Sequence, residues 1–257
     1  MMSKMMVLVR KDILEQWRTK KILIMCVIFL FVAVASPILA KITPELLKSV
    51  SVPGLSLNLP QPTNKDSLDQ FIKNISQIAL LVLVFVIAGV VSDEKSKKSL
   101  EIVMTKPVSR EKFILSKFIS SFLTISVIFM TASVIFYVYT ISIFSAFNLA
   151  NFFLMALNVL IYILMVIAIT ILASTMVKNS IMAGGIGFVS FILFGTIAGL
   201  FEGIRKFSPN LIFSNYQTIV TNGWSNDLIY PTIVTISVII ISVISAILIF
   251  KRQEIDR

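Results

Sequence analysis

The residues best suited to chemistry lie in one charged stretch, 93–112, between long apolar segments. It opens with Asp93, Glu94 and Lys95 and closes near Arg110. Reactive groups are scarce elsewhere, because the 257 residues include no His and a single cysteine, Cys26. Without His there is no His-dependent triad and no HExxH zinc site. One cysteine can form neither an intrachain disulfide nor a Cys-based metal site. We therefore expect no catalytic residue, bound cofactor or metal in this chain.

The apolar segments carry no Asp, Glu, Lys or Arg away from their ends. Ion-coupled transporters keep ionisable side chains at depth, where they carry or pair with charge despite their cost in hydrocarbon. The chain also has no Gly-x4-Gly-Lys-Ser/Thr loop to cradle nucleotide phosphates. An intramembrane enzyme is disfavoured too, since Ser or Tyr without His, Lys or Asp is a poor nucleophile. The sequence thus predicts a protein that takes its energy from another polypeptide.

The elements that hold the charged stretch are membrane helices. The chain is 57% hydrophobic and 14% charged, with a mean hydropathy of +0.94. Charge-free runs long enough to cross ~30 Å of hydrocarbon cover 22–40, 75–92, 118–177, 179–201 and 228–250. The third run holds two spans, divided where Asn148 and Asn151 offer a polar turn. We predict an all-α membrane protein, one domain over 1–257, with spans at 22–40, 75–92, 114–140, 152–177, 180–201 and 230–250.

The distribution of Lys and Arg predicts the orientation. When six spans alternate sides, seventeen of the 23 basic residues fall on the side that holds both termini. By the positive-inside rule both termini are cytoplasmic. The net charge of +10 then reflects topology and attraction to anionic membrane lipid, not nucleic acid. Because no organellar signal is evident, we expect the plasma membrane of a prokaryote.

Three segments flank the spans. In 1–21, Met6, Val9, Ile13 and Trp17 recur at helical spacing, which predicts an amphipathic helix in the interface; the alternative is a cytoplasmic extension of the first span. Segment 42–74 is predicted to be a small external loop, because four prolines oppose a long helix. Segment 202–229 mixes apolar and small polar residues after Ser208-Pro209, which predicts short re-entrant helices. An ordinary solvated loop is the alternative there.

Two helix starts are legible in the charged stretch. Ser99 can cap a short helix with Leu100, Val103 and Met104 on one face, and Thr105 to Pro107 end it. Ser109 can cap the third span. An apolar stripe on a short charged helix is suited to a groove on a partner. The alternative is that the stripe rests on the lipid surface.

The same stretch resembles type-2 ABC transporter permeases. The similarity lies in Asp93-Glu94-Lys95, in Ser99-Leu100-Glu101, and in the run from Thr105 through Pro107 to Arg110. Those permeases have an acidic-Glu-Lys/Arg start, a Gly-Thr-Leu-Glu turn and a (Ser/Thr)-x-Pro-(Val/Leu)-(Ser/Thr)-Arg ending. The chain departs from the pattern at Lys98, where the family usually has Gly. The motif covers about twenty residues, and six spans with a basic lead helix extend the likeness over the chain.

The resemblance implies the membrane half of an exporter in which two permeases pair with two ATPase subunits that bind ATP and Mg. Residues 93–112 would be the coupling loop. The residues expected to couple to the ATPase are Asp93, Glu94, Ser99, Leu100, Glu101, Val103, Met104, Pro107 and Arg110. On the fifth span, Gly195 and Gly199 form a small-xxx-small pair, whose spacing predicts close packing against a helix of the same chain or of a second copy. Ser190, Phe194 and Phe85 would line the substrate path.

The expected cargo is hydrophobic or amphipathic, such as a peptide, a lipid-like molecule or a drug, because the spans are rich in Phe and Met. Sodium extrusion by a permease of the same family is the alternative cargo. It ranks lower because no buried carboxylate is available for a desolvated cation, although backbone carbonyls could serve. A non-transporting membrane anchor or sensor, which would recruit a cytoplasmic partner through the same loop, is the rival from another class.

Overall fold

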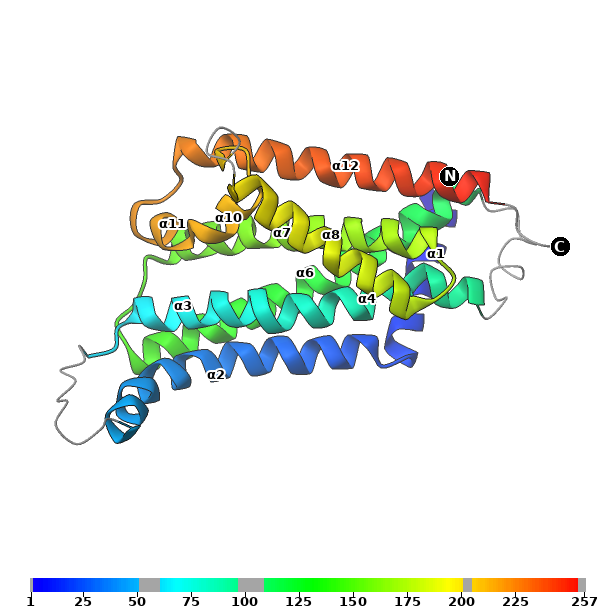
Figure 1. Ribbon diagram of the computed structural model, residues 1–257. Helices are drawn as coiled ribbons and strands as arrows, with labels where there is room; N and C mark the ends of the chain where they lie inside the picture. The colour runs from blue at the N-terminus through cyan, green and yellow to red at the C-terminus, as the bar shows by residue number, and fades with distance from the viewer. Residues whose placement is uncertain (1, 51–60, 97–108, 201–204, 254–257) are drawn as a thin grey trace.

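The protein is a bundle of long helices that run side by side (Figure 1). The computed structural model describes residues 2–50, 61–96, 109–200 and 205–253. Every regular element in these ranges is helical. The long helices are α2 (Lys21–Val50), α4 (Leu80–Ser96), α6 (Arg110–Ile143), α7 (Leu149–Met176), α8 (Ser180–Leu200) and α12 (Ile229–Arg252).

Five helical stretches of the described chain are long and apolar enough to cross a membrane. They are Lys21–Leu46, Asn64–Ser96, Arg110–Ile143, Leu149–Met176 and Asn226–Arg252. The predicted division of the long apolar run is confirmed, because α6 ends at Ile143 and the Asn148 side chain caps α7 by accepting from the Asn151 amide. In α8, the stretch that qualifies as apolar helix is shorter, Ser180–Leu193. The sixth span therefore stays a prediction.

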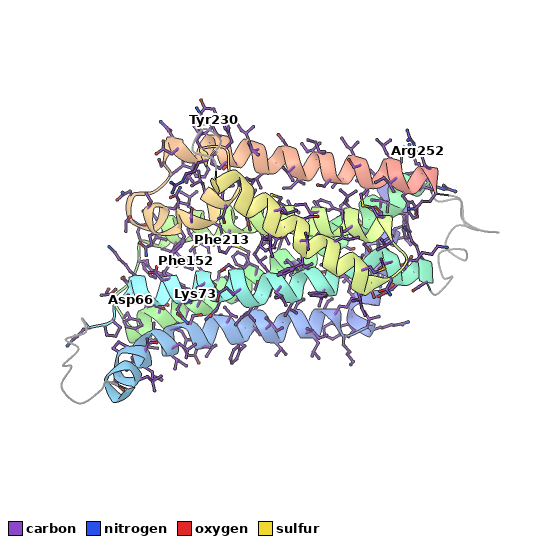
Figure 2. All side chains as sticks on the ribbon, viewed as in Figure 1. Asp66, Lys73, Phe152, Phe213, Tyr230 and Arg252 are labelled. Atoms are coloured by element: carbon purple, nitrogen blue, oxygen red, sulfur yellow. The ribbon has the colours of Figure 1, made fainter. Side chains whose placement is uncertain are left out.

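The core lies where α4 and α7 pass through the centre of the bundle. Helix α7 packs on α4, α8 and α12, while α2 packs on α6 at the edge. Stacked rings fill the core towards one end: the centroids of Phe71 and Phe136 are 4.0 Å apart, and those of Phe136 and Phe152 are 5.9 Å apart. Figure 2 places Asp66 at this end and Arg252 at the other. Apolar packing thus fixes how the helix ends meet.

The prediction of a loop over 42–74 is wrong for the two described helical parts of that segment, 42–50 and 64–74. Helix α2 continues through Pro37 and Pro44 to Val50, as membrane helices can when freed backbone groups find other partners. A further helix, α3 (Asn64–Asn74), begins at a capping box between Thr63 and Asp66. It buries Leu68 and Phe71, and it continues through the π-helical turn η1 (Ile75–Ala79) into α4. The four prolines of the segment all precede α3, so they do not interrupt its apolar stripe.

The two other flanking segments are helical as predicted. Helix α1 (Met2–Arg18) is set off from α2 by a turn at Lys20, whose φ is +62°, so the alternative of a straight extension of the first span is wrong. Between α8 and α12 lie α10 (Asn210–Ser214), α11 (Tyr216–Asn222) and the 3-10 turn η2 (Asn226–Leu228). They pack on α7, α3 and α12. Their position relative to the lipid remains a prediction.

Candidate functional site

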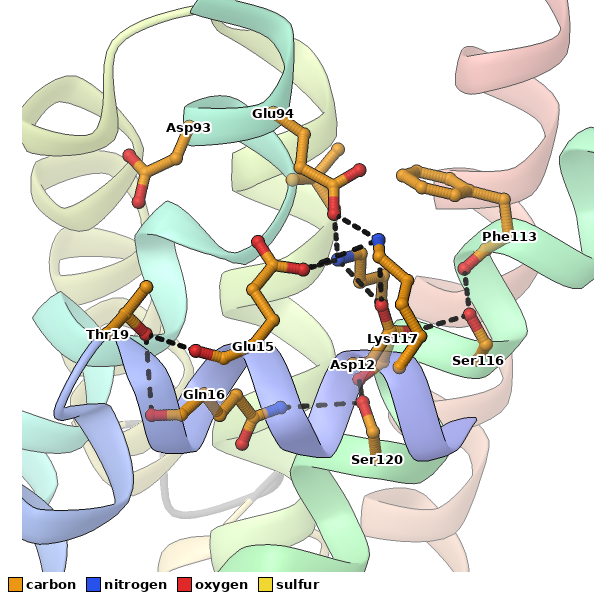
Figure 3. Close-up of polar contacts among 12 residues, drawn as sticks. Asp12, Glu15, Gln16, Thr19, Asp93, Glu94, Phe113, Ser116, Lys117 and Ser120 are labelled. Atoms are coloured by element: carbon orange, nitrogen blue, oxygen red, sulfur yellow. Dashed lines mark hydrogen bonds and ion pairs between the residues drawn. The ribbon is translucent and has the colours of Figure 1, made fainter. Parts of the chain in front are cut away.

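A cluster of five charged residues lies where α1 crosses the end of α4 and the start of α6. We call Lys11, Asp12, Glu15, Glu94 and Lys117 the ion cluster (Figure 3). The Lys117 ammonium lies 2.9 Å from Asp12 Oδ1 and 3.2 Å from Glu15 Oε2, and it also donates to Glu94 Oε1. Lys117 and Asp12 are 2% exposed and Glu94 is 4% exposed. Charges this deep persist only when they are paired and hydrogen-bonded.

A second ammonium, at the edge of the cluster, offsets the excess of carboxylates. Lys11 Nζ lies 2.8 Å from Glu94 Oε1 and 3.3 Å from Asp12 Oδ1. Burial by itself would raise the pKa of Glu15, but the nearby Lys117 and Lys11 charges lower it to about 2. Burial and Lys117 would lower the pKa of Lys11, yet its hydrogen bond and attraction to Glu94 leave it raised. Glu15 and Lys11 are therefore both charged at neutral pH.

The three carboxylates of the cluster stand close enough together to ligate a metal ion, with ligand oxygens within 4.8 Å of one another. Two ammonium groups already contact all three of them, the buried Lys117 and the half-exposed Lys11. An amine in this position competes with a metal for the same oxygens. The arrangement therefore fits ion pairs that connect α1, α4 and α6 better than it fits a metal site.

The face of α1 that meets the bundle is polar. Besides the ion cluster, Gln16 Nε2 donates to Ser120 Oγ at 3.4 Å, and Ser116 Oγ donates to Asp12 Oδ2 at 2.7 Å. Among the side chains of α1 that the structure describes, the buried ones are Asp12 and Gln16. Of the large apolar ones, Met6, Val7, Leu14 and Trp17 are between 48% and 67% exposed, whereas Leu8, Val9 and Ile13 are half-buried. The fully buried contacts of α1 are therefore made by charge and hydrogen bonds.

The last turn of α4, just before segment 97–108, is bound on two more sides. Asp93 pairs with Lys21 at 3.2 Å. Gly89 makes room for the Asp93 carboxylate, since a Cβ there would lie 2.3 Å from Oδ2. Lys95 Nζ donates to the Thr175 carbonyl at the end of α7. This side of segment 97–108 is therefore anchored to α1, α2, α6 and α7.

The other side of segment 97–108 is anchored by Arg110. Its Nη1 donates to the carbonyls of Lys251 at 2.7 Å and Gln253 at 2.8 Å. A guanidinium at these carbonyls satisfies orphan acceptors and complements the dipole of α12. Ser109 caps α6 as predicted, accepting from the Lys112 amide at 3.4 Å. The start of α6 is thereby joined to the end of α12.

Three of the residues predicted to couple to an ATPase are thus described: Asp93 is half-buried, Glu94 is buried in the ion cluster, and Arg110 contacts α12. The others lie outside the described residues: Ser99, Leu100, Glu101, Val103, Met104 and Pro107. The sequence analysis missed Lys117, Asp12 and Glu15. A signal was present, since Asp12, Glu15 and Gln16 share one face of a helix and Lys117 is the last charge before a sixty-residue neutral run.

The predicted substrate-path and packing residues lie on α4 and α8. Phe85 is 46% exposed and covers Gly184, where an added Cβ would lie 2.6 Å from the ring. Ser190 is half-buried. Phe194, Gly195 and Gly199 belong to the last part of α8, whose side-chain surroundings lie outside the described residues. Of the α8 glycines with described surroundings, Gly184 is the one that lets α8 approach α4 most closely.

Five long apolar helical stretches, with their charged residues near the ends, define a multi-pass membrane protein. Residues 6–255 match the family model of ABC-2 family transporter proteins, so the chain belongs to that family. An uncharacterised transmembrane protein of Bacillus subtilis (strain 168), YxlG, is 22% identical over 262 residues, which cover 98% of this chain and 99% of that protein. ABC-2 proteins are permeases without their own nucleotide-binding domain, and they generally pair with an ATP-binding cassette ATPase.

Proposed function

We propose that this chain is the membrane subunit of an ATP-binding cassette exporter, working as a dimer and driven by a separate ATPase that binds ATP and Mg. The observation that carries the proposal is the anchoring of segment 97–108 on both sides. Glu94 joins its first side to α1 and α6, and Arg110 joins its second side to α12. A force applied to the segment would reach α1, α2, α6, α7 and α12 through these residues and their neighbours. Segment 97–108 would contain the coupling helix. The segment and both termini would lie on the cytoplasmic side of the membrane.

The proposed cargo is hydrophobic or amphipathic. The chain contains 20 Phe and 11 Met, and its five span-length stretches keep their charges near the ends. A substrate path between such helices offers dispersion contacts to an acyl chain or an apolar peptide. It offers few groups that could compensate the charge of a desolvated ion. Phe85, exposed on α4 beside α8, is the described aromatic residue best placed to meet such a cargo. The proposed host is a prokaryotic plasma membrane.

The coupling role is tested in the predicted helix. The chain is coexpressed with ATP-binding cassette subunits of its own organism, and the complex is purified in mild detergent. Leu100→Asp/Met104→Asp is expected to abolish copurification or ATPase stimulation, because charge would enter an apolar groove. Ile102→Asp, on another face of the predicted helix, is the control and should bind as the unmodified chain does. Unchanged binding and stimulation in the double variant would remove the coupling role from this segment.

The cargo is tested in vesicles that contain the complex. MgATP should drive movement of a fluorescent phospholipid or an apolar peptide across the bilayer. Phe85→Ala should slow this movement if the ring lines the route, while Phe31→Ala, which removes a 64% exposed ring from α2, should not. Uptake of ²²Na⁺ on addition of MgATP, without movement of any amphiphile, would replace the proposed cargo with sodium.

A further inference from the structure

We propose that Lys117 is a positioning residue that fastens α1 to the first side of segment 97–108, so that the segment and α1 move together. Lys117 contacts Asp12 and Glu15 on α1 and Glu94 on α4. Glu94 is two residues from the end of α4. The proposal rests on the proposed function, in which an ATPase acts on that segment.

Lys117 is the cation through which the bundle meets the carboxylates of α1, and Lys11 adds a bond from α1 to Glu94. The fully buried side chains in the described part of α1, Asp12 and Gln16, are both polar, so its deepest contacts with the bundle are ionic or hydrogen-bonded. Lys117 is the cation that contacts every carboxylate of the cluster from the bundle side, because Lys11 belongs to α1 itself. Without Lys117, the carboxylates of α1 would face Glu94 with Lys11 alone between them. Like charges that close repel one another.

The connection between α1 and α2 gives α1 a place to turn. Lys20 has φ +62°, in the left-handed region that residues with a Cβ avoid. The turn separates α1 from α2, so the two helices are distinct elements. Beside the turn, a small crevice is lined by residues that include Thr19, Lys21 and Val90. Helix α1 is thus joined to α2 through a non-helical turn and is held to the bundle by the ion cluster.

The position of Glu94 then makes α1 a reporter of segment 97–108. A shift of the end of α4 carries the Glu94 carboxylate with it, and Lys117 and Lys11 follow because both bond to the same oxygen, Oε1. The ion cluster therefore transmits a displacement from α4 to α1 directly, through bonds between buried charged groups. Lys117 acts through Glu94 and does not itself touch the ATPase.

The test combines a docking readout with a coupling readout. In a Cys26→Ser background, Gln16→Cys and Ser120→Cys probe the α1–α6 contact by disulfide formation, since the two helices pack together and the native side chains face each other. Coupling is read as MgATP hydrolysis by the copurified complex relative to the ATPase alone. The variant is Lys117→Met, which keeps the length of the side chain and removes its charge. Lys73→Met, which removes an exposed charge from α3 outside both the cluster and the coupling loop, is the control.

Lys117→Met should lower the yield of the disulfide and reduce coupling by roughly 5–150-fold, the range of typical couplings between sites. Trapping the residual disulfide by prolonged oxidation should restore coupling, a rescue that a loss of overall stability would not give. The variant Asp12→Asn/Glu94→Gln/Lys117→Met leaves no unpaired charge and provides a folded version of the same test. It should also lose coupling until it is oxidised.

Three results would overturn parts of the account separately. If the unmodified complex is coupled and both Lys117 variants couple equally well, the positioning role is wrong and the proposed function stands. If the disulfide forms equally well in Lys117→Met, the ammonium does not dock α1. If no ATPase associates with the unmodified chain, the proposed function fails and transmission with it, while the disulfide yield still decides whether Lys117 holds α1.

Discussion

Lys117→Met is also the substitution from which we expect the largest loss of stability. The ammonium is 2% exposed and contacts the carboxylates of Asp12, Glu15 and Glu94. Removing one partner of a buried ion pair costs about 3–5 kcal/mol, because the remaining charge stays buried and uncompensated. For a chain of this size, 1 kcal/mol corresponds to about 2–4 °C in Tm. The variant should therefore unfold roughly 6–20 °C below the unmodified protein.

The measurement is thermal unfolding in mild detergent, followed by tryptophan fluorescence at one protein concentration and one heating rate. Asp12→Asn/Glu94→Gln/Lys117→Met should recover most of the loss, because replacing a whole buried ion network by neutral groups is often close to neutral. The contrast between the two variants separates uncompensated charge from lost packing. A Tm for Lys117→Met within about 2 °C of the unmodified protein, or a triple variant no more stable than the single one, would refute this reasoning.

Three further predictions concern the surroundings of the cluster. Arg110→Met should fray the end of α12, since its carbonyls lose bonds of 2.7 and 2.8 Å; faster hydrogen exchange confined to that end would show it, and unchanged exchange would contradict it. Gly89→Ala should push the Asp93 carboxylate off Lys21. The expected cost is below about 1 kcal/mol, because the pair is partly exposed and the Asp93 side chain can rotate away from the new methyl group. A loss of several degrees in Tm would show that it cannot. The pKa of Glu15 is lowered from 4.5 to about 2 in the fold. The contribution of Glu15 to the free energy of unfolding is therefore complete above pH 4.5 and is lost as the pH falls towards 2. Trp17 fluorescence in a Trp224→Phe background should report loosening of α1 in this window, with a smaller change in Glu15→Gln.

The features that could be predicted from the sequence are those that depend on neighbouring residues. The apolar runs gave the long helices, the Asn148 cap separated α6 from α7, and the Ser109 cap marked the start of α6. The stripe of Met6 and Trp17 gave α1 as an amphipathic helix, and both are exposed on its outer side. Caps and periodicity act within one or two helical turns, so a single sequence is enough to show them.

The features that could not be predicted depend on contacts between distant residues. Lys117 meets Asp12 across 105 positions of the chain, and no spacing rule connects an α1 carboxylate with the start of α6. The loop prediction for 42–74 failed because proline counts were given more weight than the spacing of Leu68, Phe71 and Ile72, which bury one face of α3. The packing predicted for Gly195 and Gly199 stays a prediction, because their surroundings lie outside the described side chains, and the described approach of α8 to α4 occurs at Gly184.

We propose that these helices depend on ATP hydrolysis by a separate subunit, which acts on them through segment 97–108. The most direct test compares vesicles that contain the purified chain alone with vesicles that contain the chain and its ATPase, using a fluorescent phospholipid as the probe. We predict movement of the probe only when the ATPase and MgATP are both present, and its loss in Leu100→Asp/Met104→Asp. Uphill movement of a solute by the chain alone would contradict the account.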